Sequence, residues 1–563
     1  MPQGVNAQLH LLTNAEVHAS YNAGHIPERG FLRCYGEVIH KAQEVYQLKM
    51  FPTGSSSLLL LAVSALSKLV NAGPQHARDV QSPYAPSSQS IGLKAIKHVA
   101  SESFKHAAPL RARSNQQTAP SNETVRVLGR APLFAAPVTI GFQTFNLLID
   151  TGSADTWVAD SYFSCMIMYR SYPASQSYCA LNSTFVHDDG PTDSVTSATN
   201  SSFFVSYADG SYVGGPLRTT YVSLTSDVAF PQLVGFASSV AFTGGNLTSG
   251  ILGLAYSSLT SQYPGTDYWN SIPCPLESPG IDDSSTNPDV PCNQRNYVGV
   301  MQNLISLDSL RDRRYFALAL SRDSSNNSDG GLLTFGGTPD YYDPRVNVSS
   351  SFVSTPIQPL AYDSTNITRF YTISVEGFTF PAFTNYSTST TSSYDYSFTN
   401  APSTHKPLRR TTTNQAHTMS QADGKSQFIV DSGTEITTIP SLYAASFNAL
   451  FDPPAYQEYS GGPWYLNCTT LSFVPPFGIT IAGQTFYHNP EDLVIRKPSR
   501  EYDYVLEEYV ETEVCFSAIQ DAEEIGDGYT NNVLGQPTLK NVLAVFDVGA
   551  SKMGFAARPY YES

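Results

Sequence analysis

Charged residues are scarce in this chain of 563 residues, at 14% of the composition, and basic residues are the scarcer kind. The 32 Lys and Arg residues stand against 48 Asp and Glu residues, which gives a formal net charge of −16. This balance argues against a nucleic-acid surface and suits a protein that stays soluble as its carboxylates begin to protonate. The abundance of Ser, Thr, Tyr, Gly and Pro favours strands and turns over a helix bundle. With 41% hydrophobic residues, the chain can form two or more lobes or domains.

Several chemical motifs are also absent from the sequence. No Cys-x-x-Cys pair or Cys/His cluster has metal-ligand spacing, no Gly-rich loop suits a phosphate, and the 11 His residues show no nucleophile–base arrangement. The apolar run Leu58–Leu66 is too short to span a bilayer, and the final residues, KMGFAARPYYES, carry no hydrophobic tail. We therefore expect no metal, no cofactor, no nucleic-acid partner and no membrane anchor.

Residues 50–72 have the pattern of a secretory signal peptide. The apolar run is followed by small residues that end at Val70-Asn71-Ala72, where a signal peptidase would cut. Because a signal peptide begins near the initiator Met, we expect translation to start at Met50 and residues 1–49 to be a doubtful extension. The alternative is an apolar helix of a folded domain.

Nine Asn-x-Ser/Thr sequences support entry into the secretory pathway, although a Ser/Thr-rich chain acquires several by chance. They begin at Asn122, Asn182, Asn200, Asn246, Asn326, Asn347, Asn366, Asn385 and Asn467. The chain has seven cysteines, of which Cys34 drops out if translation starts at Met50. Six cysteines allow about fifteen connectivities, and disulfides in an oxidising compartment are favoured over metal binding. Pairing by nearness in sequence would join Cys165 with Cys179, Cys274 with Cys292, and Cys468 with Cys515.

Two segments differ in composition from the rest of the chain. Residues 73–124 include a basic stretch from Lys94 to Arg113 ahead of an acidic body. We interpret 73–124 as a removable prosegment that lies over an acidic cleft at neutral pH, with a solvated disordered linker as the alternative. Residues 387–426 are rich in Ser and Thr and contain Arg409-Arg410, which predicts a long surface loop that is glycosylated or nicked.

The body of the chain shows mostly period-two patterns. Residues 202–224 have two β-rich arms around Asp209-Gly210, which predicts a hairpin, and residues 478–488 predict a second hairpin. The clearest helix is expected from Pro440 to Phe451. The sequence therefore predicts a mostly antiparallel β protein.

One motif occurs twice at matched spacing. FNLLIDTGSADTWV at 145–158 and QFIVDSGTEITTIP at 427–440 each place an Asp after an apolar run and follow it with a hydroxyl residue and a glycine. An apolar-apolar-Gly triplet ends at Gly253, 103 residues after Asp150, and another ends at Gly535, 104 residues after Asp431. This repetition predicts a duplicated lobe.

The residue types in this motif suit a shared-proton carboxyl pair. If the lobes pack face to face, Asp150 and Asp431 meet and cannot both ionise. The ionised member can then accept a proton from water while the neutral member protonates a peptide carbonyl oxygen. Gly152 and Gly433 permit a tight turn whose amides point at the carboxylates, and the hydroxyls of Thr151 and Ser432 can hydrogen-bond across the lobe interface.

These motifs resemble those of the pepsin-like aspartic proteases, from about Phe134 to Phe555. The resemblance is carried by LLIDTGSADTWV, SYADGSY, GILGLAY, GGLLTFGG, FIVDSGTEITTIP and VLAVFDVGASKMGFA. It implies a mostly β, bilobal fold with a cleft between an amino-terminal lobe, 125–340, and a carboxyl-terminal lobe, 341–563. The chain departs from the family pattern at Gln536-Pro537, where an Asp and an apolar residue are usual.

The resemblance also implies roles for individual residues. Asp150 and Asp431 would be the catalytic pair, supported by Ser153 and Thr434. Tyr207 would be the tyrosine of a flap hairpin, with Trp157 as its hydrogen-bonding partner. Gly210 and Ile251 would belong to the flap and substrate-binding residues, and Asp209 at the flap tip would attract Lys or Arg of a substrate. From the residues alone, Trp157, Tyr207 and Ile251 fit an ordinary core or hairpin equally well, and Asp209 an exposed turn.

Two functions follow from these expectations. The first is a monomeric acid endopeptidase that is made as a zymogen, is secreted or sent to a vacuole, and cleaves protein or peptide substrates. The second is a catalytically silent glycoprotein of the same fold that binds peptides or acts as a surface module.

Overall fold

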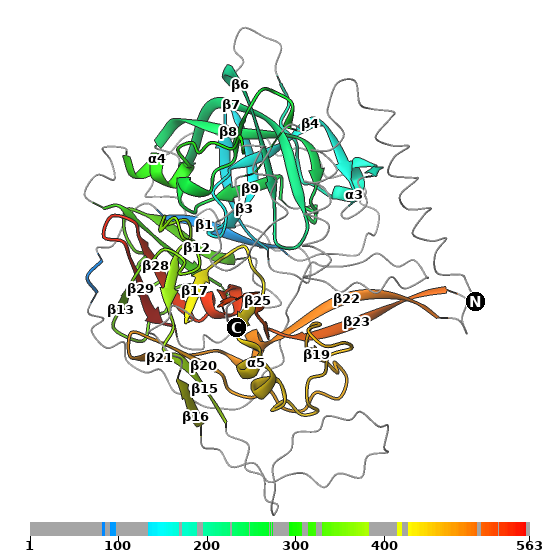
Figure 1. Ribbon diagram of the computed structural model, residues 1–563, viewed down its shortest axis with the longest axis vertical. Coiled ribbons are helices and arrows are strands. Elements are labelled where there is room, and N and C mark those ends of the chain that lie inside the picture. The colour runs from blue at the N-terminus through cyan, green and yellow to red at the C-terminus, as the bar shows by residue number, and fades with distance from the viewer. Residues whose placement is uncertain are drawn as a thin grey trace, which may run out of the picture.

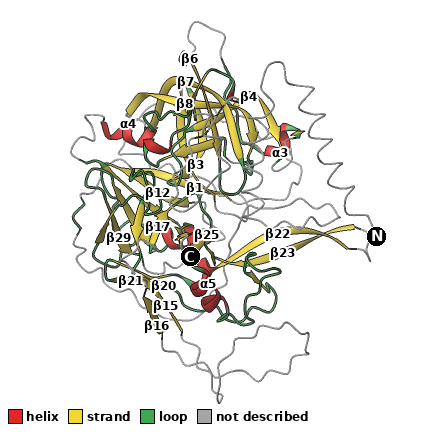
Figure 2. Ribbon diagram, viewed as in Figure 1, coloured by secondary structure: helices red, strands yellow, loops and turns green. Residues whose placement is uncertain are grey.

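The computed structural model describes residues 82–84, 90–96, 133–167, 172–187, 195–225, 228–246, 248–268, 271, 273, 292–306, 313–321, 329–381, 414–418, 426–503, 508–526 and 529–558. The predicted extension 1–49, the signal peptide 50–72, most of the prosegment, Cys274 and Arg409-Arg410 lie outside these ranges. Strands dominate the described chain, as Figure 2 shows, which confirms the predicted mostly β class.

The first lobe is built around long antiparallel strands. The β6–β7 hairpin turns at Asp209-Gly210 as predicted, and Gly210 has the positive φ of 81° that a glycine tolerates. The elements of this lobe are β2 (Leu133–Ile140), β3 (Gln143–Asp150), β4 (Trp157–Met166), β5 (Pro173–Ala174), α3 (Gln176–Cys179), β6 (Val195–Ser206), β7 (Tyr212–Thr225), β8 (Val228–Ala241), β9 (Gly250–Gly253), η1 (Ser257–Leu259), β10 (Gln262–Pro264) and α4 (Val300–Ser306).

The second lobe has shorter strands in several small sheets. The predicted hairpin at 478–488 forms as β20 and β21, and the predicted helix forms as α5 directly after Pro440. The elements are β14 (Thr372–Ser374), β15 (Gly377–Pro381), β16 (Asn414–Thr418), β17 (Gln427–Val430), β18 (Thr437–Ile439), α5 (Ser441–Asn448), β19 (Tyr465–Leu466), β20 (Gly478–Ile481), β21 (Gln484–Tyr487), η4 (Pro490–Leu493), β22 (Val494–Asp503), β23 (Glu508–Ser517), β24 (Ile519–Asp521), β25 (Glu523–Gly526), β26 (Tyr529–Asn531), β27 (Val533–Leu534) and α6 (Gln536–Leu539).

Strand β16 corrects the prediction of a loop throughout 387–426. It pairs antiparallel with β15 from Gly377↔Thr418 to Pro381↔Asn414. The backbone groups of β15 require partners on both sides, and β16 supplies them on one side while β20 supplies them on the other. The polar sequence NQAHT has no hydrophobic alternation, so its strand pairing is set by the neighbouring strand and not by its own pattern.

A sheet layer lies between the lobes and joins them. In Figure 1 its strands β1, β12, β28 and β29 lie between the upper lobe, with β4 and β6–β9, and the lower part of the second lobe, with β15, β20 and α5. The layer has the order β1-β12-β11-β28-β29-β13 and continues into β2 of the first lobe. Its strands are β1 (Ser90–Ile96), β11 (Tyr315–Leu320), β12 (Asp329–Phe335), β13 (Val353–Pro356), β28 (Val542–Asp547) and β29 (Lys552–Ala557).

Burial explains why this layer holds the molecule together. All six residues of β11 are buried, and Phe316 stacks on Phe546 of β28 with ring centroids 4.4 Å apart. Tyr371, which precedes β14 of the second lobe, is fully buried against both rings, and its hydroxyl donates to the carbonyl of Leu254 in the first lobe at 2.6 Å. The two lobes therefore share one continuous core.

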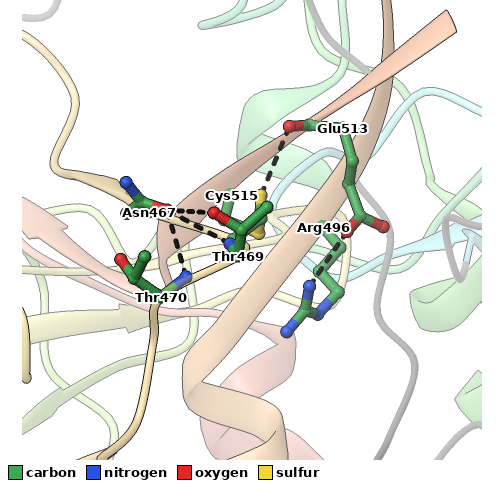
Figure 3. The surroundings of a disulfide bond; sticks show 7 residues. Asn467, Thr469, Thr470, Arg496, Glu513 and Cys515 are labelled. Carbon is green, nitrogen blue, oxygen red and sulfur yellow. Dashed lines mark hydrogen bonds and ion pairs between the residues drawn. A yellow bond between two sulfur atoms is a disulfide. The ribbon is translucent and has the colours of Figure 1, made fainter.

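Two of the three predicted disulfides are present, Cys165–Cys179 and Cys468–Cys515. Cys292 is also disulfide-bonded, whereas its predicted partner Cys274 lies outside the described residues. Figure 3 shows the Cys468–Cys515 bridge, next to the Arg496–Glu513 ion pair at 2.9 Å. Among the described residues, one group is spaced like metal ligands: Cys468, Glu513 and Cys515. The sulfurs of Cys468 and Cys515 are bonded to each other, so they are not thiolates that could bind a metal.

No helix in the described part of the chain is long and apolar enough to cross a membrane.

Candidate active site

The two Asp residues lie at the ends of equivalent strands: Asp150 is the last residue of β3, and Asp431 directly follows β17. β3 runs parallel to β9 with Asp150 opposite Gly253, and β17 runs parallel to β27 with Val430 opposite Leu534. The duplicated spacing therefore reflects a duplicated strand pair. The glycine that follows each apolar pair is required, since a Cβ at Gly253 would lie 2.5 Å from the backbone carbon of Ala154. A Cβ at Gly535 would lie 1.9 Å from the carbonyl oxygen of Ile436.

A reciprocal set of hydrogen bonds ties the two loops together across the lobes. The hydroxyl of Thr151 donates to the carbonyl of Val430 at 2.9 Å, and the hydroxyl of Ser432 donates to the carbonyl of Ile149 at 2.8 Å. Each hydroxyl oxygen also accepts from the backbone N–H of the other residue, at 2.9 Å for Thr151 and 3.2 Å for Ser432. Both side chains are fully buried. These contacts are the cross-lobe hydrogen bonds that the sequence predicts for Thr151 and Ser432.

Each carboxyl group is held by two donors of its own loop. Asp150 accepts from the Gly152 N–H at 2.8 Å and from the Ser153 hydroxyl at 2.5 Å. Asp431 accepts from the Gly433 N–H at 2.7 Å and from the Thr434 hydroxyl at 2.5 Å. The same atoms are used in both lobes, one amide on Oδ1 and one hydroxyl on Oδ2. The planes of both carboxyl groups are therefore fixed in advance of any ligand.

The two carboxyl groups lie against each other. A Cβ at Gly152 would approach Cγ of Asp431 to 2.6 Å, and a Cβ at Gly433 would approach Oδ1 of Asp150 to 2.6 Å. Burial and, second to it, the charge of Asp431 raise the pKa of Asp150 far above its usual range, although the Ser153 hydroxyl opposes the shift. Asp150 is 6% exposed. The pair consequently keeps one proton at a pH where an exposed Asp has lost it.

The hairpin predicted as a flap carries Tyr207, whose phenol lies within electrostatic reach of Asp150. The Tyr207 hydroxyl accepts from the indole N–H of Trp157 at 2.8 Å, the contact implied by the resemblance. Burial and then the charge of Asp150 raise the pKa of Tyr207, so its phenol stays protonated. At the tip, Asp209 accepts from the amide and hydroxyl of Ser211 at 2.9 and 2.6 Å. The Asp209 carboxylate is exposed but anchored inside its own turn.

Ile251, which the resemblance places among the substrate-binding residues, lies in the core of the first lobe. It is 2% exposed and packs with Trp157 and Leu148 in a buried cluster of the first lobe. The reason is that β9 runs between β3 and β4, with hydrogen-bonded neighbours on both sides. The structure thus favours the alternative interpretation of Ile251 as a core residue.

Three residues that sequence reasoning did not assign also shape the site. Gln536, at the departure from the family pattern, is buried and donates through Nε2 to the Ser432 carbonyl at 3.1 Å. Asp155 is 1% exposed and accepts from the hydroxyl of Tyr297 at 2.8 Å. Asp155 follows Asp150 by only five residues, and this nearness could have pointed to it from the sequence. Tyr297 lies 142 residues after Asp155, so no local pattern indicates their contact.

Two similar lobes that meet at a pair of coupled carboxyl groups define this protein as a pepsin-like aspartic proteinase. A family model described as eukaryotic aspartyl protease matches residues 133–395 and 389–558. The chain therefore belongs to the eukaryotic aspartyl protease family and is an aspartic-type endopeptidase.

Similar proteins come from fungi. A probable aspartic-type endopeptidase of Aspergillus fumigatus is 29% identical over 432 residues, which cover 75% of this chain and 78% of that protein. A vacuolar aspartic protease of Candida albicans is 24% identical over 74% of this chain and 72% of its own length. The crystal structure of an aspartic proteinase from Irpex lacteus aligns with a TM-score of 0.47 and 19% identity, over 76% of this chain and 95% of that one.

Proposed function

We propose that Asp150 and Asp431 are the catalytic residues of this endopeptidase and that they activate water at acid pH. The observation that carries the proposal is the close approach of the two carboxyl groups at Gly152 and Gly433, in a setting that retains one shared proton. The ionised carboxylate accepts a proton from a water molecule, and the neutral carboxyl donates one to the oxygen of the peptide carbonyl. The resulting tetrahedral diol collapses when its nitrogen is protonated, which releases the amine. Since the pair titrates as a unit, the proton belongs to neither residue alone.

The surrounding residues support this chemistry by position. Ser153 and Thr434 orient the two carboxyl groups, and Thr151 and Ser432 keep the two loops at a fixed separation. Tyr207, on the flap hairpin, would close over an extended peptide whose backbone pairs in strand fashion. The substrates in this proposal are proteins and peptides, and the reaction requires no cofactor.

We further propose that the chain is a zymogen whose prosegment includes β1. Although β1 lies within 73–124, it pairs antiparallel with β12 and with β2 in the layer between the lobes. Tyr84 is 8% exposed and packs against Tyr315 with ring centroids 5.3 Å apart. Acid treatment followed by amino-terminal sequencing should find a new terminus between Ile96 and Leu133. An unchanged terminus in fully active protein would contradict the zymogen proposal.

The proposed setting is extracellular, with a vacuole as the alternative. The signal-like residues 50–72, the nine Asn-x-Ser/Thr sequences and the disulfides favour an oxidising secretory route. The Candida albicans relative is a vacuolar protein by name, which keeps the second destination open. We propose a glycosylated monomer, and deglycosylation with sizing of the culture medium and of vacuoles would test the location, glycans and oligomeric state together.

The test of the catalytic proposal is the Asp431→Asn variant. General acid–base catalysis contributes about 10²- to 10⁴-fold, so we expect cleavage of a denatured protein at acid pH to fall by about 10³-fold or more. The matched control is Asp340→Asn, since Asp340 is exposed and its carboxylate accepts from the Tyr342 amide within its own loop. Cleavage should also be inhibited by pepstatin. Unchanged cleavage in Asp431→Asn would refute the catalytic role of Asp431, whereas no cleavage by the unaltered protein would favour the silent peptide-binding glycoprotein.

A further inference from the structure

Asp155 is a buried carboxyl group that has no role in the proposed catalysis. Asp155 directly precedes Thr156 and Trp157 and is 1% exposed. Its Oδ1 accepts from the Ser261 amide at 3.0 Å and from the Tyr297 hydroxyl at 2.8 Å. The Ser261 hydroxyl also hydrogen-bonds to the carboxyl group, and all of these donors are neutral. A carboxylate buried among neutral donors lacks the counter-ion that buried charges normally have.

The ionisable groups around Asp155 are tyrosines. Tyr297 donates to it directly, Tyr263 lies on β10 just after Ser261, and Tyr207 lies on the flap hairpin. Burial raises the pKa of all three phenols, and so does the negative charge of Asp155, which for Tyr207 ranks after the charge of Asp150. All three phenols therefore stay protonated in the acid and neutral range. Burial in turn raises the pKa of Asp155 to about 6. Asp155 is therefore mostly protonated at acid pH. At neutral pH it carries a buried charge that has hydrogen-bond donors but no cationic partner in the part of the chain that the structure describes.

Asp155 is connected to the flap by two routes. Along the chain, Trp157 follows two residues later and donates to the Tyr207 hydroxyl at 2.8 Å. Through space, Tyr297 and Tyr207 pack against the same buried cluster, which includes Trp157 and Ile251. The phenol of Tyr297 is thus fixed at its hydroxyl by Asp155 while its ring supports the flap side of the cluster. A change in the charge of Asp155 acts on both supports of Tyr207.

We propose that Asp155 and Tyr297 are positioning residues that hold Tyr207 in its working place while Asp155 is protonated, and that ionisation of Asp155 loosens the flap. The buried charge needs water, and water reaches it only when the packing of Tyr297 and Tyr207 opens. The inference rests on the proposed function, in which Tyr207 covers the substrate. It gives the enzyme an upper pH limit that is separate from the titration of the Asp150–Asp431 pair.

Hydrogen exchange of the flap amides tests this inference without depending on activity. The full chain is compared in an Asp431→Asn background, with and without Asp155→Asn, at pH 5 and pH 7. The amide introduced by Asp155→Asn keeps an acceptor oxygen for Ser261 and Tyr297 but cannot ionise. One pH unit above a pKa of about 6, roughly one Asp155 carboxyl in ten remains protonated. Between pH 5 and pH 7, the amides of residues 205–213 should therefore lose about tenfold more protection in the chain with Asp155 than in the chain with Asp155→Asn.

Two further variants sharpen the result. Tyr297→Phe keeps the ring but removes the link to Asp155, so its flap protection at pH 5 should fall to the level that the chain with Asp155 and Tyr297 intact shows at pH 7. Asp340→Asn should behave as the unaltered chain. In the active enzyme, the kcat/KM of Asp155→Asn is divided by that of the unaltered enzyme at each pH. This ratio should be about tenfold larger at pH 7 than at pH 5. Equal flap protection with and without Asp155→Asn at both pH values would overturn the inference, whereas unchanged cleavage in Asp431→Asn would overturn only the catalytic proposal.

Discussion

At the scale of single residues, the site is a set of donors that leaves each carboxyl group one orientation. Ser153 and Thr434 occupy the same position in the two loops and bond the same oxygen of their Asp. These contacts could be predicted from the sequence because they are local, within three residues of each Asp. The contact between Asp155 and Tyr297 could not, because it joins distant segments through the fold.

The Ser153→Ala variant tests the role of one donor. The Ser153 hydroxyl lowers the pKa of Asp150, so its removal should raise that pKa and move the alkaline limb of the activity profile, where the pair loses its retained proton, to higher pH. A hydrogen bond to a charged group contributes about 1.5–3 kcal/mol, which corresponds to a displacement of about one pH unit or more. The profile of kcat/KM between about pH 2 and 8 measures it. Ser446→Ala, which removes an exposed hydroxyl on α5, is the control and should leave the limb in place.

At the scale of elements, hydrophobic periodicity predicted the strands that bury one face, and glycine-containing turn sequences predicted the turns between them. The β6–β7 and β20–β21 hairpins and helix α5 are of this kind. Strand β16 is different, since its polar residues pair with an edge that other residues create. Helix α6 is also set by context, because it begins after Gly535 with Gln536-Pro537, where the side chain of Gln536 bonds the Ser432 loop.

Gly535 and Gly483 are required for different reasons, Gly535 for close packing and Gly483 for the backbone conformation of a turn. Gly535→Ala would force a Cβ to within 1.9 Å of the Ile436 carbonyl oxygen, so we expect the free energy of unfolding to fall by about 4 kcal/mol or more. Gly483→Ala, at the β20–β21 turn, meets no atom within 4 Å and suffers only from its positive φ of 77°. Its cost should be about 1–2 kcal/mol. Urea unfolding of both variants decides the matter, and equal losses would contradict the assigned packing role of Gly535.

At the scale of the whole molecule, buried carboxyl groups make the fold more stable in acid. Asp150, Asp155 and Asp521 have pKa values raised by burial, so folding takes up protons at these sites. For Asp155, the resulting stabilisation is fully present below about pH 4 and is lost as the pH rises through about 6. Asp343 and Asp363 act oppositely. Hydrogen bonds and an ion pair with Arg345 outweigh burial and lower the pKa of Asp343. The hydrogen bonds from Thr365 and then from Arg369 do the same for Asp363, so the stabilisation from both groups is lost as the pH falls below about 4.

The free energy of unfolding should therefore be higher at pH 4.5 than at pH 7.5. Asp155 alone accounts for a difference of about 2 kcal/mol between these two pH values, because its stabilisation of about 3 kcal/mol is complete only below about pH 4. Urea unfolding at the two pH values measures the difference, and Asp155→Asn should reduce it. A protein that gains stability toward neutral pH would refute this account of its buried acids.

The central claim concerns the two lobes together: Asp150 and Asp431 share one proton in the folded protein. The most direct measurement is an NMR or infrared titration of isotope-labelled Asp carboxyl groups, with Asp431→Asn as the comparison. We predict two well-separated steps for the pair, with one proton retained far above the usual Asp range, and a lower pKa for Asp150 once the charge of Asp431 is removed. Two carboxyl groups that both lose their protons near pH 4, unaffected by the substitution, would contradict it.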